Sequence, residues 1–377
     1  MKQQTCDCQY NCTDVKINKQ EAAKKSSTQL ISKHYIDGNV DYKNLVIPKV
    51  TTVLTTKDTF GAILSRISRY RLAYTIKPGL YATGNPNASS DVFISANYKL
   101  SFDHLRKNLN GLNAWILVLD TKGINVWCAA GKGTFGTDEL IHRINESKIK
   151  EVINHNRIIV PQLGGPGVNA PKVQQKTGLK IYYGPVFAKD IKTFLQDKYN
   201  ASKKMRKITF SIKDRIILTP MELLPFFKKY PLFAILMVII FSLHSKNLSI
   251  ESGFYNSMPH LLFGLVAILT GAFFTPLLLP IIPCRAFSLK GLFLGTLITL
   301  FMYLFVTPSV NIFETLFIFI FYPAITSFIA LQFTGSTTFT HLSGVNKEIK
   351  IALPFYIGSW ILSIAALSAY LISTWRV

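Results

Sequence analysis

The C-terminal part of the chain is dominated by long apolar blocks, and these blocks limit its fold more than any other feature. After Tyr230 charged residues become rare. The apolar blocks are Pro231–Leu243, Met258–Ile282, Gly291–Val306, Ile312–Phe333 and Ile351–Ile372. A helix needs about 20 apolar residues to span a bilayer, so the first block is short and the third needs its flanks. The pattern predicts an all-α transmembrane domain of about five helices over residues 230–377.

The charges between the apolar blocks predict their orientation. Two loops that would lie on the same side as the N-terminal part carry Arg285, Lys290, Lys347 and Lys350. The segments on the other side carry Lys246 and Arg376. Because basic loops favour the cytoplasmic side, we expect a multi-pass protein of the cell (inner) membrane with a cytoplasmic N-terminal domain.

The positive charge is concentrated before the apolar blocks. The 377 residues carry a formal net charge of +22, and the part up to Lys229, with 36 Lys/Arg and 17 Asp/Glu, carries +19 of it. Such a balance is common in nucleic-acid-binding proteins. Beside a membrane domain, attraction to anionic lipid headgroups explains it more simply, so we expect membrane lipid and no nucleic acid among the partners.

Two segments outside the main domains have open interpretations. Residues 201–229 form a basic connector, which could hold the soluble domain against the membrane or be an ordinary solvated linker. Within it, Ile208–Ile212 and Ile216–Leu218 could add a strand. Residues 1–45 are polar, Lys-rich and without periodicity, which predicts a mobile tail.

The cysteines of that tail do not predict a metal site. Cys6, Cys8 and Cys12 are one ligand short of the four that a structural zinc or an iron–sulfur cluster usually takes. The polar N-terminus does not have the form of a signal peptide, so we expect a reducing compartment. The odd total of five cysteines also argues against a disulfide framework.

Residues 46–200 alternate short apolar runs with amphipathic stretches, which predicts an α/β, Rossmann-like domain with a mostly parallel sheet and helices on both faces. The expected strands are Val92–Ala96, Trp115–Leu119, Asn125–Cys128, Arg157–Val160 and Lys180–Tyr183. The expected helices are Phe102–Asn108, Asp138–Asn145, Val168–Thr177 and Lys189–Lys198. Ligands of such sheets bind beyond the carboxyl ends of the strands, where Cys128, Gln162 and Tyr183-Gly184 fall.

The stretch Asn125-Val126-Trp127-Cys128-Ala129-Ala130-Gly131-Lys132 (the octet) is the strongest candidate site. Small residues beside a thiol allow a large, flat partner to approach the backbone, although a single cysteine could equally be an inert core residue. Gly131-Lys132 is not a phosphate loop, because Val126 stands where that motif needs glycine. A Cys/His hydrolase stays open, since the sequence does not say whether His104, His142 or His155 lies near the thiol.

All eight residues of the octet match the signature of the mercury-methylating corrinoid protein family, HgcA, in which the cysteine lies on a helix that caps a cobalamin. From about Ile76 to Asp190 the chain is also similar to the corrinoid domain of the corrinoid iron–sulfur protein of the acetyl-CoA pathway. That similarity is carried by Pro78–Tyr81, Ala96–Asp103, Pro161–Val168 and Tyr183–Pro185. The Asp-x-His-x-x-Gly pattern of corrinoid proteins with a histidine ligand is absent from the sequence.

The resemblance implies a cobalamin bound base-off, with Cys128 as the lower axial ligand of cobalt and as the catalytic residue. A thiolate is a strong donor that would favour release of a methyl group to a soft electrophile such as mercury(II). The further cofactor contacts that we expect are the other residues of the octet (Asn125, Val126, Trp127, Ala129, Ala130, Gly131 and Lys132) together with Asn97, Gln162, Gly164 and Gly165.

The implied function is a membrane-anchored corrinoid-dependent methyltransferase that converts inorganic mercury(II) to methylmercury. The implied partners are a ferredoxin-like iron–sulfur protein, HgcB, as electron donor, and a methyl donor protein or methyltetrahydrofolate system. Two alternatives stay open. One is a corrinoid methyl carrier of one-carbon or acetyl-CoA metabolism, and the other is a non-enzymatic membrane transporter or sensor with a cytosolic ligand-binding domain.

Overall fold

The computed structural model describes residues 32–43, 45–243, 249–306, 311–335, 337 and 342–375. The chain divides into a first unit, Met1–Ser65 with Arg69–Lys207, and a second unit, Arg66–Ser68 with Ile208–Val377. Cys6, Cys8, Cys12 and the predicted tail as far as residue 31 lie outside the described residues. The remainder of that predicted tail is ordered into a 3₁₀ turn η2 (Ser32–Tyr35) and a strand, so its expected end at residue 45 is wrong.

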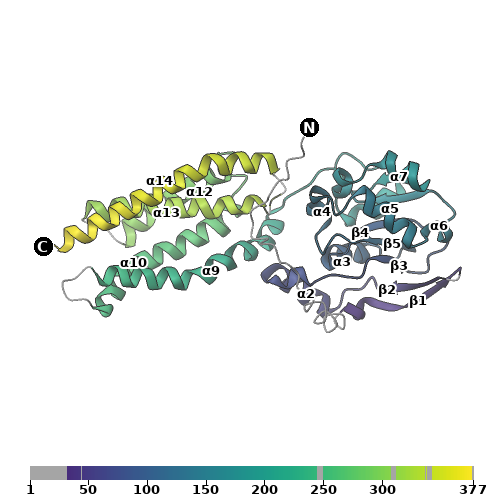
Figure 1. Cartoon of the computed structure of the whole chain (residues 1–377), viewed down its shortest axis with the longest axis horizontal. Coiled ribbons are helices and arrows are strands. Elements are labelled where there is room, and N and C mark those ends of the chain that lie inside the picture. The colour runs from purple at the N-terminus through teal and green to yellow at the C-terminus, as the bar shows by residue number, and fades with distance from the viewer. Residues whose placement is uncertain are drawn as a thin grey trace. The chain divides into compact units, whose positions relative to one another are not determined.

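The described part of the first unit contains a seven-stranded sheet in the order β1-β2-β3-β5-β4-β6-β7 (Figure 1). The strands are β1 (Ile36–Tyr42), β2 (Leu45–Val50), β3 (Gly79–Thr83), β4 (Val92–Ala96), β5 (Ala114–Leu119), β6 (Arg157–Val160) and β7 (Lys180–Tyr183). Strands β5, β4, β6 and β7 run parallel to one another, whereas β3 is antiparallel to β5 and β1 is antiparallel to β2. The predicted α/β domain with a mostly parallel sheet is therefore confirmed.

Helices cover both faces of this sheet because alternate strand residues point to opposite sides. On one side Ile94 and Leu117 pack with α4 (Val126–Lys132), α5 (Thr137–Glu146), α6 (Ile149–Val152) and α7 (Ala170–Thr177). On the other side Phe93 and Ile116 pack with α3 (Lys99–Asn108) and α8 (Ile191–Gln196). A further helix, α2 (Thr56–Ile67), and the 3₁₀ turn η3 (Arg69–Leu72) lie between β2 and β3 in the chain. The remaining 3₁₀ turns are η4 (Gln162–Gly167) and η5 (Ala188–Asp190).

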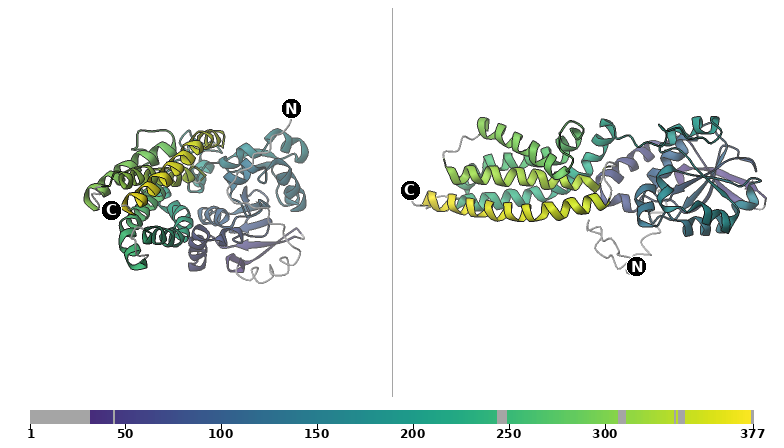
Figure 2. Two further views of the ribbon diagram at one scale, coloured as in Figure 1. Left: turned by 60° about the vertical axis from the view of Figure 1, so that its left-hand side comes forward. Right: turned by 90° about the horizontal axis from the view of Figure 1, so that it is seen from above.

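The second unit is helical, and five of its described helices are long and apolar enough to cross a membrane. The elements are α9 (Ile212–Ser242), α10 (Ile250–Leu269), the π-helical turn η6 (Thr270–Phe274), α11 (Thr275–Leu277), α12 (Phe287–Val306), α13 (Ile312–Gln332), the 3₁₀ turn η7 (Phe333–Gly335) and α14 (Leu342–Trp375). In Figure 2 the long helices run side by side. These five helices are compatible with a multi-pass membrane protein, as the apolar blocks predict.

The strand that we allowed within residues 208–218 is wrong. Ser211 caps α9: its hydroxyl accepts from the backbone N–H of Asp214, and the Asp214 carboxylate accepts from the backbone N–H of Ser211. This reciprocal pair is a capping box, a strong signal for a helix start. Most of the expected connector, from Ile212 onward, is therefore the first part of α9.

Small residues allow the apolar helices to pack closely. A Cβ on Gly291 would lie 2.5 Å from Cβ of Ala330, and one on Gly271 would lie 2.7 Å from Cβ of Ile329. Close backbone approach of this kind is the usual way in which helices associate in lipid. A partly buried polar contact also joins α10 to α13, where Nε2 of His260 lies 3.1 Å from Oε1 of Glu314.

Candidate functional site

The candidate site lies at the carboxyl ends of the parallel strands. Asn97 follows β4, Asp120 follows β5, Gln162 follows β6 at one residue's distance, and Gly184 follows β7. Because these four strands are parallel neighbours, all four ends meet at one edge of the sheet. The chain between β5 and α5 begins at this edge and contains the octet.

Asn97 holds the loop that leads into the octet. Its side-chain Oδ1 accepts from the backbone N–H groups of Thr121 at 3.1 Å and Gly123 at 2.9 Å, and from the Thr121 hydroxyl at 2.8 Å. Its Nδ2 donates to Oδ1 of Asp120 at 3.2 Å. The structure therefore gives Asn97 a positioning role, and its predicted contact with a cofactor stays a prediction.

Asp120 and Glu139 fasten this loop to α5. The backbone N–H of Asp120 donates to Oε1 of Glu139 at 2.8 Å, and Glu139 is in turn paired with Arg143 at 2.9 Å. Burial alone would raise the pKa of the Asp120 carboxyl, but the hydrogen bonds and charge of Lys122 outweigh it and lower that pKa. The carboxylate therefore stays ionised at neutral pH.

The octet forms the short helix α4, so the strand predicted at Asn125–Cys128 is wrong. Val126 and Trp127 favour a strand by composition. The Asn125 side chain, however, accepts from the backbone N–H of Cys128 at 2.9 Å and caps the first turn of a helix. Gly133, with φ of +80°, ends the helix in the left-handed conformation. Cys128 is therefore on a helix, as the resemblance to the mercury-methylating family implies.

The buried side of α4 packs against η4, and this contact requires glycine. A Cβ on Gly167 would lie 2.1 Å from the carbonyl oxygen of Phe135 and 3.1 Å from Cα of Ala130. A Cβ on Gly164 would lie 2.4 Å from the Phe135 ring, which is fully buried. Gly164, a predicted cofactor contact, thus has a packing role. We did not identify Gly167 and Phe135 as site residues from the sequence. The sequence pattern that could have indicated them is a single aromatic residue, Phe135, between glycines.

The other side of α4 presents the rest of the octet. Gly131 and Lys132 are exposed, and Trp127 and Cys128 are half-buried. Within the described part of the chain, the side chains of Trp127, Cys128 and Lys132 make no hydrogen bond or ring contact. A Cβ on Gly131 would meet no atom within 4 Å. These side chains are therefore accessible to a ligand.

The segment after β6 lies beside α4 and includes the predicted contacts Gln162 and Gly165. Oε1 of Gln162 accepts from Nη1 of Arg206 at 2.5 Å, so this predicted contact already has a partner. Gly165 is not required by packing, because its nearest neighbour would be the Tyr183 ring at 3.6 Å. The Thr134 hydroxyl oxygen, just after α4, is buried and has no hydrogen-bond partner among the described residues. Unpaired buried hydroxyls are few in folded proteins, and this one lies next to the end of α4.

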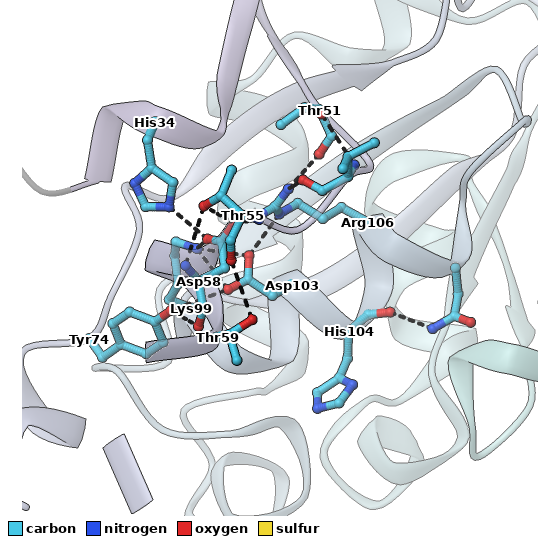
Figure 3. Close-up of polar contacts among 12 residues, drawn as sticks. His34, Thr51, Thr55, Asp58, Thr59, Tyr74, Lys99, Asp103, His104 and Arg106 are labelled. Atoms are coloured by element: carbon cyan, nitrogen blue, oxygen red, sulfur yellow. Dashed lines mark hydrogen bonds and ion pairs between the residues drawn. The ribbon is translucent and has the colours of Figure 1, made fainter. Parts of the chain in front are cut away.

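The histidines that could have served a Cys/His hydrolase lie elsewhere. Nε2 of His142 lies 3.6 Å from Oε2 of Glu146, on the exposed side of α5. His155 precedes β6, where its Nε2 contacts the carbonyl oxygen of Ser90 at 3.0 Å. His104, labelled in Figure 3, lies on α3. Helix α3 packs on the opposite face of the sheet from α4. This arrangement gives no support to nucleophilic catalysis by a Cys/His pair.

A buried ion-pair cluster of Asp58, Lys99, Asp103 and Arg106 lies away from the octet, on the α3 side of the sheet (Figure 3). Lys99 Nζ donates to Oδ1 of Asp58 at 2.6 Å and to Oδ1 of Asp103 at 2.8 Å. Arg106 pairs with Asp103 at 2.7 Å and with Asp58 at 2.8 Å. Two anions and two cations balance, so the segment Ala96–Asp103 contributes structure here.

Comparisons with known proteins cover the region around this site. Residues 70–195 match the family model of the CO dehydrogenase/acetyl-CoA synthase delta subunit. The gamma subunit of the acetyl-CoA decarbonylase/synthase complex from Archaeoglobus fulgidus is 30% identical over 131 residues, which cover 34% of this chain and 27% of the relative. The corresponding subunit from Methanopyrus kandleri is 25% identical over 144 residues, covering 36% of this chain and 31% of the relative. That from Methanosarcina acetivorans is 27% identical over 120 residues, covering 31% and 25%.

These matches are partial on both sides. The chain spans between a quarter and a third of the length of these relatives. The family match contains the octet and the ends of β4, β5, β6 and β7, and it stops before α9. The likeness therefore concerns the candidate site and its sheet, and the apolar helices lie outside it.

Proposed function

We propose that this chain is a membrane-anchored corrinoid protein that carries a methyl group on cobalt, with Cys128 as the lower axial ligand. The matches to acetyl-CoA synthase subunits support a corrinoid-protein family for residues 70–195. The observation that carries the proposal is the placement of Cys128, half-buried on a short capped helix at the carboxyl edge of the sheet. The open space beside Gly131, where a Cβ would meet no atom within 4 Å, supports the approach of a flat macrocycle to α4.

Different residues in and beside α4 would hold the corrinoid in different ways. A bound corrinoid supplies a cobalt centre that accepts and releases a methyl group. Cys128 would hold the corrinoid through its sulfur, which is free and half-buried on α4. The Asn125 cap fixes the backbone of Cys128 and thereby the direction of its side chain. Trp127, Lys132 and the unpaired Thr134 hydroxyl would contact the macrocycle and its polar edge.

Mercury(II) is the acceptor that we propose for the methyl group, because all eight residues of the octet agree with the mercury-methylating signature. The reaction class is methyl transfer from cobalt to a soft metal cation. We further propose an iron–sulfur protein of the HgcB type as the electron donor, and a methyl donor protein or methyltetrahydrofolate system as the source of the methyl group. The first unit, called the soluble unit from here on, would face the cytoplasm, since the basic loops of the second unit favour that side.

A second acceptor class has direct support from the comparisons. The matched relatives are named as subunits of an acetyl-CoA decarbonylase/synthase complex, which favours a methyl carrier of one-carbon metabolism more directly than mercury methylation. Both assignments share the corrinoid, Cys128 and the carrier step. They differ only in the group that receives the methyl.

The test begins with the visible spectrum of the purified full-length protein from cells supplied with cobalamin. We expect a corrinoid spectrum from the unchanged protein and an altered or lost one from Cys128→Ala. Cys284→Ala is the matched control, because Cys284 is a half-buried free cysteine outside the soluble unit, and we expect it to keep the spectrum. A folded, colourless unchanged protein would refute the corrinoid assignment and would leave the transporter or sensor, which substrate uptake into vesicles would support.

The acceptor is decided with methyl-loaded protein offered mercury(II) or an acetyl-CoA synthase system. Methylmercury formation that Cys128→Ala abolishes supports the first assignment, whereas acetyl-CoA formation without methylmercury supports the second. Cys128→His separates ligation from packing, because imidazole binds cobalt as a neutral, weaker donor. We expect it to retain some corrinoid and to lose most of the transfer activity.

A further inference from the structure

Helix α2, which belongs to the first unit as far as Ser65 and to the second at Arg66 and Ile67, has its polarity inverted. Its buried residues are Asp58, Gly61 and Ser65, which are polar or small. On the opposite side of the helix Phe60 is 62% exposed, Ile63 is 50% exposed and Ile67 is also exposed. Positions 60, 63 and 67 have helical spacing and share one face. An ordinary amphipathic helix would bury this apolar face against the core.

The inversion is caused by the buried ion-pair cluster. Asp58 is 2% exposed and pairs with both Lys99 and Arg106, so this side of α2 must face inward. Gly61 completes the contact, because a Cβ there would lie 2.6 Å from the Tyr74 hydroxyl oxygen. The unit therefore fixes α2 firmly and leaves its apolar residues on the outside.

Basic residues surround this apolar face. Lys57 precedes Phe60 on the helix and is exposed, and in η3, which follows α2, Arg69 is exposed and Arg71 is half-buried. The acid of α2, Asp58, is buried and paired, so it does not offset them. Val53 and Leu72, one on each side of α2 in the chain, are also exposed. Apolar residues flanked by Lys and Arg are the pattern of a helix that lies in a membrane interface.

We propose that α2 binds the surface of a membrane that contains anionic lipid, with Phe60, Ile63 and Ile67 inserted between the headgroups and the adjacent basic residues on lipid phosphates. The apolar helices of the same chain keep the bilayer close, so a contact that is weak in isolation would be populated. A protein surface would fit the apolar residues as well, but Lys57, Arg69 and Arg71 form no ion pair with the described residues, which favours an anionic partner. This role is independent of the corrinoid and of the methyl acceptor.

The test is photo-crosslinking of the full-length protein in vesicles. The photoreactive residue p-benzoylphenylalanine replaces Phe60 in one variant and Ile63 in another. In the matched control it replaces Gln175, an exposed helical residue on α7, a helix of the soluble unit that packs on the sheet. Each variant is placed in phosphatidylcholine vesicles with and without phosphatidylglycerol, illuminated, and analysed by mass spectrometry for lipid and protein adducts.

We expect lipid adducts at positions 60 and 63 and few at 175. Phosphatidylglycerol should raise the yield at 60 and 63 by about fivefold for each basic residue that reaches the surface. Equal lipid labelling at 60 and 175, or labelling that does not respond to phosphatidylglycerol, would overturn the proposal. Adducts with a second copy or with a co-purified protein would also overturn it. A Lys57→Gln, Arg69→Gln variant carrying the probe at position 60 should lose the response to phosphatidylglycerol while keeping its insertion in the membrane.

Discussion

Replacing Lys99 by Met tests whether the buried ion-pair cluster holds the soluble unit together. The Lys99 ammonium lies within 2.8 Å of carboxylate oxygens of both Asp58 and Asp103, and the side chain is 2% exposed. Met keeps the apolar stem but leaves the two buried carboxylates with the Arg106 guanidinium, and with the His34 ring 2.7 Å from Asp58. Breaking a buried pair by removing one partner costs about 3–5 kcal/mol, and water does not screen the charges at this depth.

The effect can be measured by pulse proteolysis of the full-length protein in detergent micelles with increasing urea, with cleavage sites in the soluble unit read by mass spectrometry. With a urea dependence of about 2 kcal/mol per molar, the expected cost lowers the unfolding midpoint by about 1.5–2.5 M. Lys122→Met is the matched control, because Lys122 is paired with Asp120 but its side chain is 70% exposed. An exposed pair contributes at most about 1 kcal/mol.

The same variant makes a prediction about pH. Burial would raise the pKa of Asp58, but hydrogen bonds from Lys99 and the Thr55 backbone, with the charge of Lys99, outweigh it and hold that pKa well below its ordinary value. A lowered pKa stabilises the fold above the unfolded carboxyl value of about 4, and this stability is lost as the pH falls below it. In Lys99→Met burial is no longer outweighed by the Lys99 ammonium, so the pKa of Asp58 rises toward or above its unfolded value and the loss of stability at acid pH should shrink. Equal midpoints for Lys99→Met and Lys122→Met at pH 7 would refute this account of the cluster.

Three changes around α4 separate packing from ligand binding, each measured by the urea midpoint and by corrinoid content. Asn125→Ala removes the cap on Cys128 and should cost about 1 kcal/mol, whereas Asn125→Asp should retain most of it; equal losses would contradict the capping role. Gly167→Ala places a Cβ 2.1 Å from the Phe135 carbonyl oxygen and should greatly reduce the amount of folded protein. Gly131→Ala meets no atom and should keep or raise stability by up to about 1 kcal/mol while weakening corrinoid binding; unchanged binding would place the macrocycle elsewhere.

The central strands could be predicted because they are buried on both faces. Val92–Ala96 and Arg157–Val160 have the predicted bounds, and the first of these is buried at every position. The edge strand Lys180–Tyr183 also has the predicted bounds, although it is only partly buried. A strand covered on both faces is a continuous apolar run, which composition shows directly. The outer strand β1 has the sequence IDGNVDY and is largely exposed, so nothing in its pattern distinguishes it from a loop. Strand β3 is apolar but short, and Pro78 and Gly79 at its start indicate a turn.

The helical errors have a different physical cause, which is the capping of helix ends. Ser211 and Asp214 start α9 among charged residues that a search for apolar blocks passes over. Pro220, Pro225 and Pro231 lie within that helix and would each be expected to interrupt it. At α4, the four residues from Asn125 have strand composition, and one side-chain hydrogen bond decides the outcome. Such a cap depends on the position of one side-chain atom. Helix and strand propensities averaged over several residues do not detect it.

The residues of the octet differ in whether folding requires them. Asn125 is needed as a cap, and Ala129 and Ala130 are buried where α4 meets η4, so their identities follow from local structure. Folding does not demand Trp127, Cys128 or Lys132, whose side chains have no hydrogen bond or ring contact among the described residues. Leaving a tryptophan half-exposed to water does not stabilise the fold. Another apolar residue or a small residue at this position would allow the same helix. These residues therefore favour a ligand on this helix. We expect their replacement to weaken ligand binding more than it lowers the free energy of unfolding.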